Sequence, residues 1–219
     1  MPCPRVLVLD LDGTLVDTVP DLAAALNRLM DSRGLTRFDF PGTAAMVGDG
    51  VARLVEKAFA ARGGVPDATA IAEFSADYAA HAAVDSCLFP GAMDSLRTLA
   101  AEGWRFAVCT NKPEGAARVL LDALDLTPLM AAVGGGDSFP VRKPDPAHLL
   151  ATLAAAGGEP ARAVMIGDHA NDVAASQGAG LPCIFAAWGY GPLAMAEGAV
   201  AIAPSMADVA EIVRQLLPD

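Results

Sequence analysis

Two aspartates separated by a single residue follow the first apolar segment of the chain. Residues Val6 to Leu9 are branched and apolar, which predicts a short buried strand with Asp10 and Asp12 at its carboxyl end. Ligands of open α/β sheets bind at this edge. There Asp10 can attack phosphorus and form an aspartyl-phosphate, while Asp12 can protonate the leaving oxygen and later deprotonate the attacking water. Solvated acids in a turn are the simpler interpretation of such a triplet taken alone.

Three further polar clusters favour the chemical interpretation. Thr110-Asn111-Lys112 follows one predicted strand, and residues 167–172 (Gly-Asp-His-Ala-Asn-Asp) follow another. Arg142-Lys143-Pro144 lies on the loop before the helix that precedes the second of these strands. Because the carboxyl ends of parallel strands meet at one edge of a doubly wound sheet, we expect the clusters to converge on one crevice.

The residue types in these clusters suit phosphoryl transfer. Asp10 and Asp168 offer the hard carboxylate oxygens that Mg²⁺ prefers, and the ion offsets the repulsion between an anionic nucleophile and an anionic phosphate. Thr110, with the backbone N–H groups after it, can donate hydrogen bonds to phosphoryl oxygens, and Lys143 can neutralise charge there. Asp172 stands one helical turn after Asp168, where it can hold Lys143 or metal-bound water.

The elements that position these clusters are predicted from hydrophobic periodicity. Residues 19–88 contain amphipathic helical patterns and no predicted strand, whereas helices and strands alternate from Pro90 onward. Further strands are predicted at residues 106–110, 130–133, 163–166, 182–186 and 200–202. This order predicts an α/β fold with a doubly wound parallel sheet and an all-helical insertion after the first strand. We expect residues 1–16 and 88–219 to form the core and residues 17–87 a cap domain.

Composition excludes several classes of protein. The formal net charge of −11 over 219 residues argues against nucleic acid or an anionic membrane as a partner. No apolar stretch is long enough to span a bilayer and no signal peptide is recognisable, so we expect a cytoplasmic protein. The four cysteines are widely spaced and are interpreted as buried or inert thiols. His81 and His148 are interpreted as residues on helix surfaces.

The clusters, in this order, resemble the motifs of the haloacid dehalogenase superfamily. Its first motif corresponds to D-L-D-G-T-L-V-D at residues 10–17, and Thr110, Lys143 and the G-D-x-x-x-D segment at 167–172 correspond to the other three. The resemblance implies a Rossmann-like core, a helical cap and Mg²⁺ held by Asp10, Asp168 and the backbone carbonyl of Asp12. An acid at position 12 favours a phosphatase over a dehalogenase, because an alcohol needs a proton to leave and a halide does not.

At a finer level the sequence looks like the bacterial phosphoglycolate phosphatases. The similarity lies in D-T-V-P-D-L from position 17, V-G-D-G from 47, L-F-P-G from 88, T-N-K-P from 110 and G-Y-G from 189. It implies hydrolysis of 2-phosphoglycolate to glycolate and phosphate, with Asn111, Gly48, Asp49 and Gly50 binding the substrate. Asp49 stands where that family more typically has Asn, which adds negative charge near a carboxylate substrate, and His169 stands where Ser is usual.

Other functions on the same scaffold remain open from sequence. A sugar-phosphate phosphatase, an inorganic pyrophosphatase and a phosphoglucomutase would share these motifs, and a receiver-like signalling module also phosphorylates an aspartate beside Mg²⁺. The helical insertion and Asp12 speak against the signalling module, because a switch gains from slow hydrolysis. The expected partner is a small phosphorylated metabolite, and the chain is expected to be a monomer or a homodimer. Trp188 and Tyr190 either close over the site or pack at a strand exit.

Overall fold

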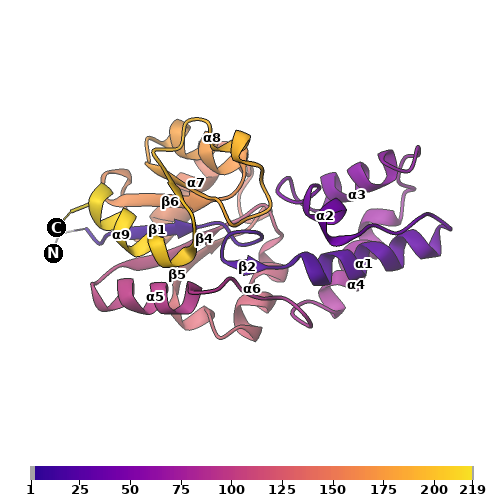
Figure 1. The fold of residues 1–219 in the computed structure, drawn as a ribbon, viewed down its shortest axis with the longest axis horizontal. Coiled ribbons are helices and arrows are strands. Elements are labelled where there is room, and N and C mark those ends of the chain that lie inside the picture. The colour runs from indigo at the N-terminus through magenta and orange to yellow at the C-terminus, as the bar shows by residue number, and fades with distance from the viewer. Residues whose placement is uncertain (1–2, 219) are drawn as a thin grey trace.

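A six-stranded parallel sheet lies at the centre of the larger part of the molecule, in the order β5-β4-β1-β6-β7-β8 (Figure 1). The computed structural model describes residues 3–218. Its sheet strands are β1 (Val6–Leu9), β4 (Arg105–Cys109), β5 (Met130–Gly134), β6 (Ala163–Gly167), β7 (Cys183–Ala186) and β8 (Ala201–Ala203). Leu9 pairs with Val108 of β4 and with Ile166 of β6. The residues after these three strands therefore meet at one edge of the sheet.

Helices cover both faces of this sheet, so the predicted doubly wound α/β fold is confirmed. One face carries α5 (Ala92–Ala101), α6 (Glu114–Ala123) and α9 (Met206–Leu216), and the other carries α7 (Pro146–Ala155) and α8 (Ala170–Ala179). Three short 3₁₀ helices, η1 (Thr127–Leu129), η2 (Pro160–Arg162) and η3 (Leu193–Ala196), lie in the connections. In β1, Leu7 and Leu9 pack into one hydrophobic cluster, and Val6 and Val8 pack into the other. Burial on both faces explains why this strand is apolar at every position.

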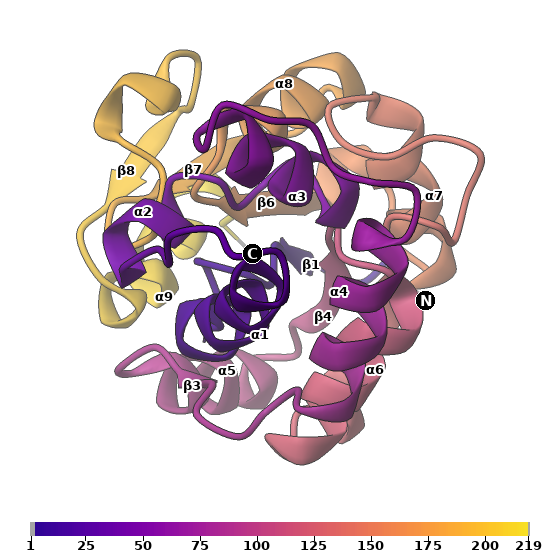
Figure 2. The ribbon, with the colours of Figure 1, turned by 90° about the vertical axis from the view of Figure 1, so that its right-hand side faces the viewer.

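Four helices form a second, smaller part of the molecule with its own hydrophobic core. They are α1 (Val19–Ser32), α2 (Phe40–Ala44), α3 (Val51–Ala60) and α4 (Ala70–Ala80). Leu26, Met30 and Phe74 are fully buried among them. Figure 1 shows these helices beyond the end of the sheet opposite the chain termini, and Figure 2 shows α1, α3 and α4 in front of the strands.

The two parts are joined by a short antiparallel ribbon that the sequence did not predict. Strands β2 (Val16–Asp17) and β3 (Cys87–Leu88) pair with each other. The chain leaves the sheet through β2 and returns to it through β3. Each strand has two residues, which is too short for periodicity to detect. Helix α2 was also not predicted, because Pro41 and Gly42 are poor helix formers. Its N-terminus is held by the Asp39 side chain, which accepts a hydrogen bond of 2.8 Å from the Gly42 N–H group.

One interpretation of a single residue needs correction. His148 is fully buried rather than on a helix surface, and its imidazole is held between two backbone groups near the sheet edge. Cys109 and Cys183 are buried as expected, but Cys87 is exposed. Across residues 3–218, the helices are all too short or too polar to cross a membrane.

The Asp21 carboxylate fastens the start of α1 to the chain that returns toward the sheet. It accepts hydrogen bonds from the backbone N–H groups of Val84, Asp85 and Ser86, at 2.9 to 3.0 Å, and from Ser86 Oγ at 2.6 Å. Burial alone would raise the pKa of Asp21, but these donors hold the pKa below its usual value. The carboxylate therefore acts as a fixed anchor beside the ribbon.

We predict that Asp21→Ala lowers the free energy of unfolding by about 3 kcal/mol, because several buried donors lose a charged acceptor. Chemical denaturation of the purified variant measures this. Asp77→Ala is the matched control, since its ion pair with Arg28 lies at the surface and contributes about 1 kcal/mol or less. Equal, small losses in the two variants would show that the Asp21 anchor does not stabilise the fold.

Candidate active site

Three aspartates at the carboxyl ends of β1 and β6 crowd into one buried site. Asp10 follows β1, Asp168 follows β6, and Asp172 lies in the first turn of α8. One carboxylate oxygen from each lies within 4.8 Å of the others, and all three side chains are buried. Burial, with the neighbouring carboxylates, raises the pKa of Asp168 to about 7, and burial raises the pKa of Asp10 to about 6. Such a cluster favours a bound cation.

Lys143 places a positive charge among these three carboxylates. Its Nζ atom lies 2.8 Å from Asp10 Oδ1 and 2.6 Å from Asp172 Oδ1. Burial alone would lower the pKa of Lys143, but the two carboxylates raise it above its ordinary value. The second oxygen of Asp172 accepts a hydrogen bond of 3.0 Å from the His169 N–H group at the start of α8. Asp172 therefore holds Lys143, which is one of the two arrangements that the sequence predicted.

The loop that carries Lys143 is held by backbone contacts. Asn111 Nδ2 donates to the Lys143 carbonyl at 3.0 Å, and the Lys143 N–H group donates to His148 Nδ1 at 3.2 Å. His148 Nε2 lies 3.0 Å from the Gly135 carbonyl oxygen. Burial and the nearby ammonium lower the pKa of His148, which favours the neutral ring that can accept at one nitrogen and donate at the other.

Asp168 is oriented by donors from two other loops. Thr14 Oγ1 donates to its Oδ1 atom at 3.0 Å, and the Tyr190 N–H group donates to Oδ2 at 2.7 Å. Gly13 has φ +88°, and a Cβ atom there would lie 2.5 Å from Asp168 Oδ2. The glycine after Asp12 is thus required both for the turn and for the close approach of the carboxylate.

Tyr190 packs beside the ribbon instead of lying as a free lid over the site. Its hydroxyl group donates to Asp17 Oδ1 at 2.7 Å and accepts from the N–H groups of Thr18 and Val19. The same residue therefore contacts the Asp168 carboxylate through its backbone and the base of the helical part through its side chain.

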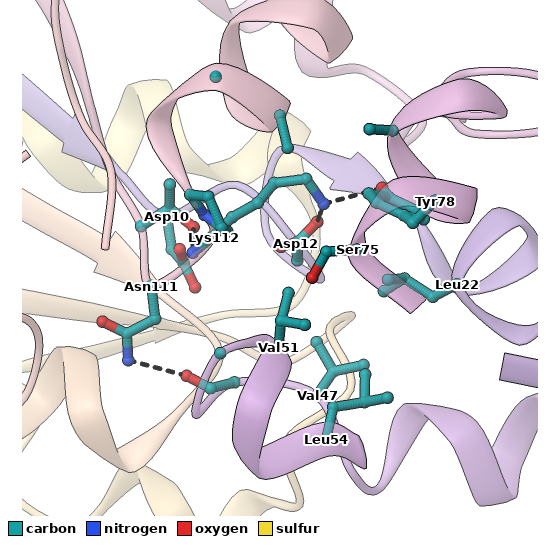
Figure 3. A pocket seen from close by; sticks show the side chains of 17 residues that line it. Asp10, Asp12, Leu22, Val47, Val51, Leu54, Ser75, Tyr78, Asn111 and Lys112 are labelled. Atoms are coloured by element: carbon teal, nitrogen blue, oxygen red, sulfur yellow. Dashed lines mark hydrogen bonds and ion pairs between the residues drawn. The ribbon is translucent and has the colours of Figure 1, made fainter. Parts of the chain in front are cut away.

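Asp12 lies beside a lysine to which the sequence analysis assigned no role. Lys112 Nζ donates to Asp12 Oδ1 at 2.9 Å and to the Tyr78 hydroxyl of α4 at 2.8 Å (Figure 3). Burial alone would lower the pKa of Lys112, but Asp12 and Tyr78 raise it above its ordinary value. The signal was available in part, because Lys112 comes directly after Thr110 and Asn111 in the cluster beyond β4.

A cavity of about 320 Å³ lies between the sheet edge and the helices. Its floor includes Asp10, Asp12, Thr110 and Asn111. The opposite wall is mainly apolar, as Figure 3 shows, and is formed by Leu22, Val47, Val51, Leu54 and Tyr78. The predicted nucleophile and the predicted acid thus share one chamber with residues from both parts of the molecule.

The predicted binding segment at residues 48–50 reaches this chamber with its glycines. Gly48 and Gly50 line the cavity, and the Gly48 carbonyl accepts a hydrogen bond of 3.0 Å from Asn111 Nδ2. The Asp49 side chain instead pairs with Lys57 Nζ at 2.7 Å and with Asn171 Nδ2 at 2.8 Å. Lys57 therefore balances the negative charge that Asp49 brings, and Asp49 itself acts at the contact between the two parts.

The structure brings the predicted core residues together: Asp10, Asp12, Thr110, Asn111, Lys143, Asp168 and Asp172. The contacts made by Thr14, Tyr78, Lys112 and His148 were not predicted. Thr14 lies within the first motif, which was a partial signal. Tyr78 carried none, because its position in α4 is an ordinary core position of an amphipathic helix.

Comparisons with known proteins agree with this geometry. The model of the haloacid dehalogenase-like hydrolase family matches residues 4–180. The phosphoglycolate phosphatase of Rhodospirillum rubrum is 41% identical over 217 residues, which cover 95% of this chain and 90% of that protein. The phosphoglycolate phosphatase of Caulobacter vibrioides is 42% identical over 188 residues, covering 84% of this chain and 79% of that protein.

A solved structure shows the same fold over almost the whole chain. The crystal structure of a predicted phosphoglycolate phosphatase from Haemophilus somnus 129PT has a TM-score of 0.87 and 27% sequence identity, and the match covers 97% of this chain and 99% of that one. The resemblance seen in the sequence motifs is confirmed. The chain belongs to the haloacid dehalogenase-like hydrolases and is an enzyme of that family.

Proposed function

We propose that this enzyme is a Mg²⁺-dependent phosphomonoesterase that converts 2-phosphoglycolate to glycolate and phosphate. The observation that carries the proposal is the placement of Asp10 and Asp12 on the floor of one cavity, each beside a different buried lysine. This gives two carboxylates distinct surroundings, which is the condition for distinct roles. The relatives named phosphoglycolate phosphatase support the choice of substrate.

The proposed reaction has two displacements at phosphorus. An Asp10 carboxylate oxygen forms a bond to phosphorus as the ester P–O bond breaks, and Asp12 gives its proton to the leaving glycolate oxygen. Asp12, now ionised, takes a proton from water as the water oxygen attacks the aspartyl-phosphate. The bond from phosphorus to the Asp10 oxygen then breaks, which releases phosphate and regenerates both carboxyl groups in their starting states.

The same residues fit the cation that this chemistry needs. We assign Mg²⁺ to the side chains of Asp10 and Asp168 and to the backbone carbonyl of Asp12. The raised pKa values of Asp10 and Asp168 support this, because they mark buried carboxylates that a cation would keep ionised. When bound, Mg²⁺ supplies positive charge against the phosphoryl oxygens. Asp172 holds Lys143 in place without being a metal ligand in this assignment.

Other side chains bind the phosphoryl group and enclose the reaction. We assign Thr110 and Lys143 to the phosphoryl oxygens, and Asn111 to the substrate side of the same floor. Residues 1–16 and 88–219 act as the catalytic core and residues 17–87 as a cap. The segment 48–50 closes the chamber at the side of the leaving group, which excludes bulk water while the phosphoryl group is transferred to Asp10.

Asp10→Asn should abolish turnover, because an amide cannot attack phosphorus. Asp12→Asn should still form the phospho-enzyme with an activated ester but should turn over about 10² to 10⁴ times more slowly. Phosphate release and trapping of the phospho-enzyme measure the two steps. Unaltered fold, checked by circular dichroism, is the control for both variants. Substantial residual turnover in Asp10→Asn would contradict its role as the nucleophile.

Removing the metal should make stability depend on pH in a defined direction. The folded-state pKa of Asp168 is raised from 3.8 to about 7, so metal-free protein keeps this carboxyl protonated at low pH and loses stability as the pH rises from about 4 to about 7. We expect the Tm of the wild type in EDTA to fall relative to that of Asp168→Asn across this range, and Mg²⁺ to restore it above pH 7. A difference in Tm that is independent of both pH and Mg²⁺ would contradict the metal assignment.

A panel of phosphate esters tests the substrate. We expect 2-phosphoglycolate to have the highest kcat/KM against pyrophosphate, glucose 6-phosphate, β-glucose 1-phosphate and AMP, by about tenfold or more, which corresponds to about 1.4 kcal/mol. Isomerised sugar phosphate in place of free phosphate would indicate a mutase. Asp49→Asn should alter the ranking more than it alters turnover of p-nitrophenyl phosphate. If another ester exceeds phosphoglycolate tenfold, the substrate assignment is wrong and the phosphatase assignment stands.

A further inference from the structure

Lys112 carries a buried ammonium group with an unused donor. An ammonium has three N–H donors, and Lys112 donates one to Asp12 Oδ1 and one to the Tyr78 hydroxyl. Within residues 3–218, the third N–H group has no protein acceptor. The side chain is 3% exposed, so water has little access to it. A buried donor of this kind gains from an acceptor that arrives with a ligand.

The rest of the cavity offers a ligand no other basic side chain. Among the described residues that line it, Lys112 is the only lysine or arginine. The facing wall is largely aliphatic, and Val47, Val51 and Leu54 contribute to it. A carboxylate buried in such a chamber is strongly destabilised unless it is paired with a cation. Lys112 is therefore the one place on this side of the floor where a second anionic group of a substrate is stabilised.

The position of Lys112 relative to the proposed acid fixes where that anionic group must be. Asp12 has to lie beside the ester oxygen to protonate it, and Lys112 Nζ is 2.9 Å from Asp12 Oδ1. In 2-phosphoglycolate a single methylene separates the ester oxygen from the carboxylate. When the ester oxygen lies at Asp12, the carboxylate is thus within reach of the neighbouring ammonium.

We infer that Lys112, anchored by Tyr78, is the residue that selects for a carboxylate adjacent to the phosphorylated hydroxyl. This inference rests on the proposed function and extends it to a substrate class, the phosphate monoesters of 2-hydroxy acids. The substrate carboxylate accepts a hydrogen bond from the third N–H group of Lys112. The ammonium therefore contacts both Asp12 and the leaving group. Tyr78 belongs to α4, which means that the helical part of the molecule completes this contact.

The competing explanation is that Lys112 acts only by holding Asp12. In that case, loss of the ammonium would impair all esters that need a protonated leaving group to the same degree. Ethyl phosphate separates the two explanations, because it keeps the alkyl ester and lacks the carboxylate. The ratio of kcat/KM for 2-phosphoglycolate to that for ethyl phosphate cancels any common effect on Asp12.

The test measures this ratio, with Mg²⁺ present, in the wild type, Lys112→Met, Tyr78→Phe and Arg53→Met. We expect the wild type to favour phosphoglycolate by about tenfold or more and Lys112→Met to lower the ratio by about 10- to 100-fold, as for one charged hydrogen bond. Tyr78→Phe keeps the ammonium but removes its anchor on α4, so it should lower the ratio less than Lys112→Met does. Arg53→Met removes an exposed basic side chain of α3 that lies outside the cavity and, among the described residues, pairs only with Glu56, and it should leave the ratio unchanged.

An unchanged ratio in folded Lys112→Met would overturn the inference. A wild-type ratio near one would also overturn it, and that measurement does not depend on the folding of any variant. Either result leaves the proposed phosphatase function standing, provided that phosphoglycolate is hydrolysed. Hydrolysis of p-nitrophenyl phosphate without hydrolysis of phosphoglycolate would instead overturn the proposed substrate. Restoration of the ratio in Lys112→Arg would support a requirement for the charge.

Discussion

The contact on which the site depends is the buried pairing of Lys143 with Asp10 and Asp172. A lysine without a partner in this position would be unstable, and two carboxylates without the lysine would repel each other. Asp168 adds a third carboxylate, so the cluster contains more acidic than basic groups. The chain therefore folds into a site that is short of one cation, and the same deficit that destabilises the cluster makes binding of a divalent ion favourable.

This pairing explains why several distant loops are so closely fitted. Asp10 is fixed by the register of β1 between β4 and β6, whereas Lys143 lies on an irregular loop that no strand positions. Asn111 and the buried His148 take the place of a strand by binding both backbone groups of Lys143. Replacing a histidine on the surface would cost little stability, whereas the buried His148 imidazole helps to hold the proposed phosphate-binding lysine in place.

The features that could be predicted from the sequence are those with strong local patterns. The apolar run of β1, the strand ends and the motif residues are all local features, so Asp10, Thr110 and Asp168 were placed correctly at one edge. The ribbon of β2 and β3 was missed because two residues carry no periodicity, and it forms only because distant segments pair. The contact of Lys112 with Tyr78 was missed for a related reason, since it depends on how α4 is oriented toward the sheet.

The contacts around the cavity differ in how costly they are to break. The pairs around Lys143 are buried within the core, and removing one partner leaves an uncompensated charge. Two of the links between the helices and the sheet edge are the partly buried hydrogen bonds from Asn111 to Gly48 and from Asn171 to Asp49, whose net stabilisation is about 1 kcal/mol each because water can replace them. The groups proposed for phosphoryl chemistry are thus held rigidly, while the wall that meets the leaving group is attached by exchangeable contacts. In the proposed reaction, the substrate enters by opening the second set of contacts without disturbing the first.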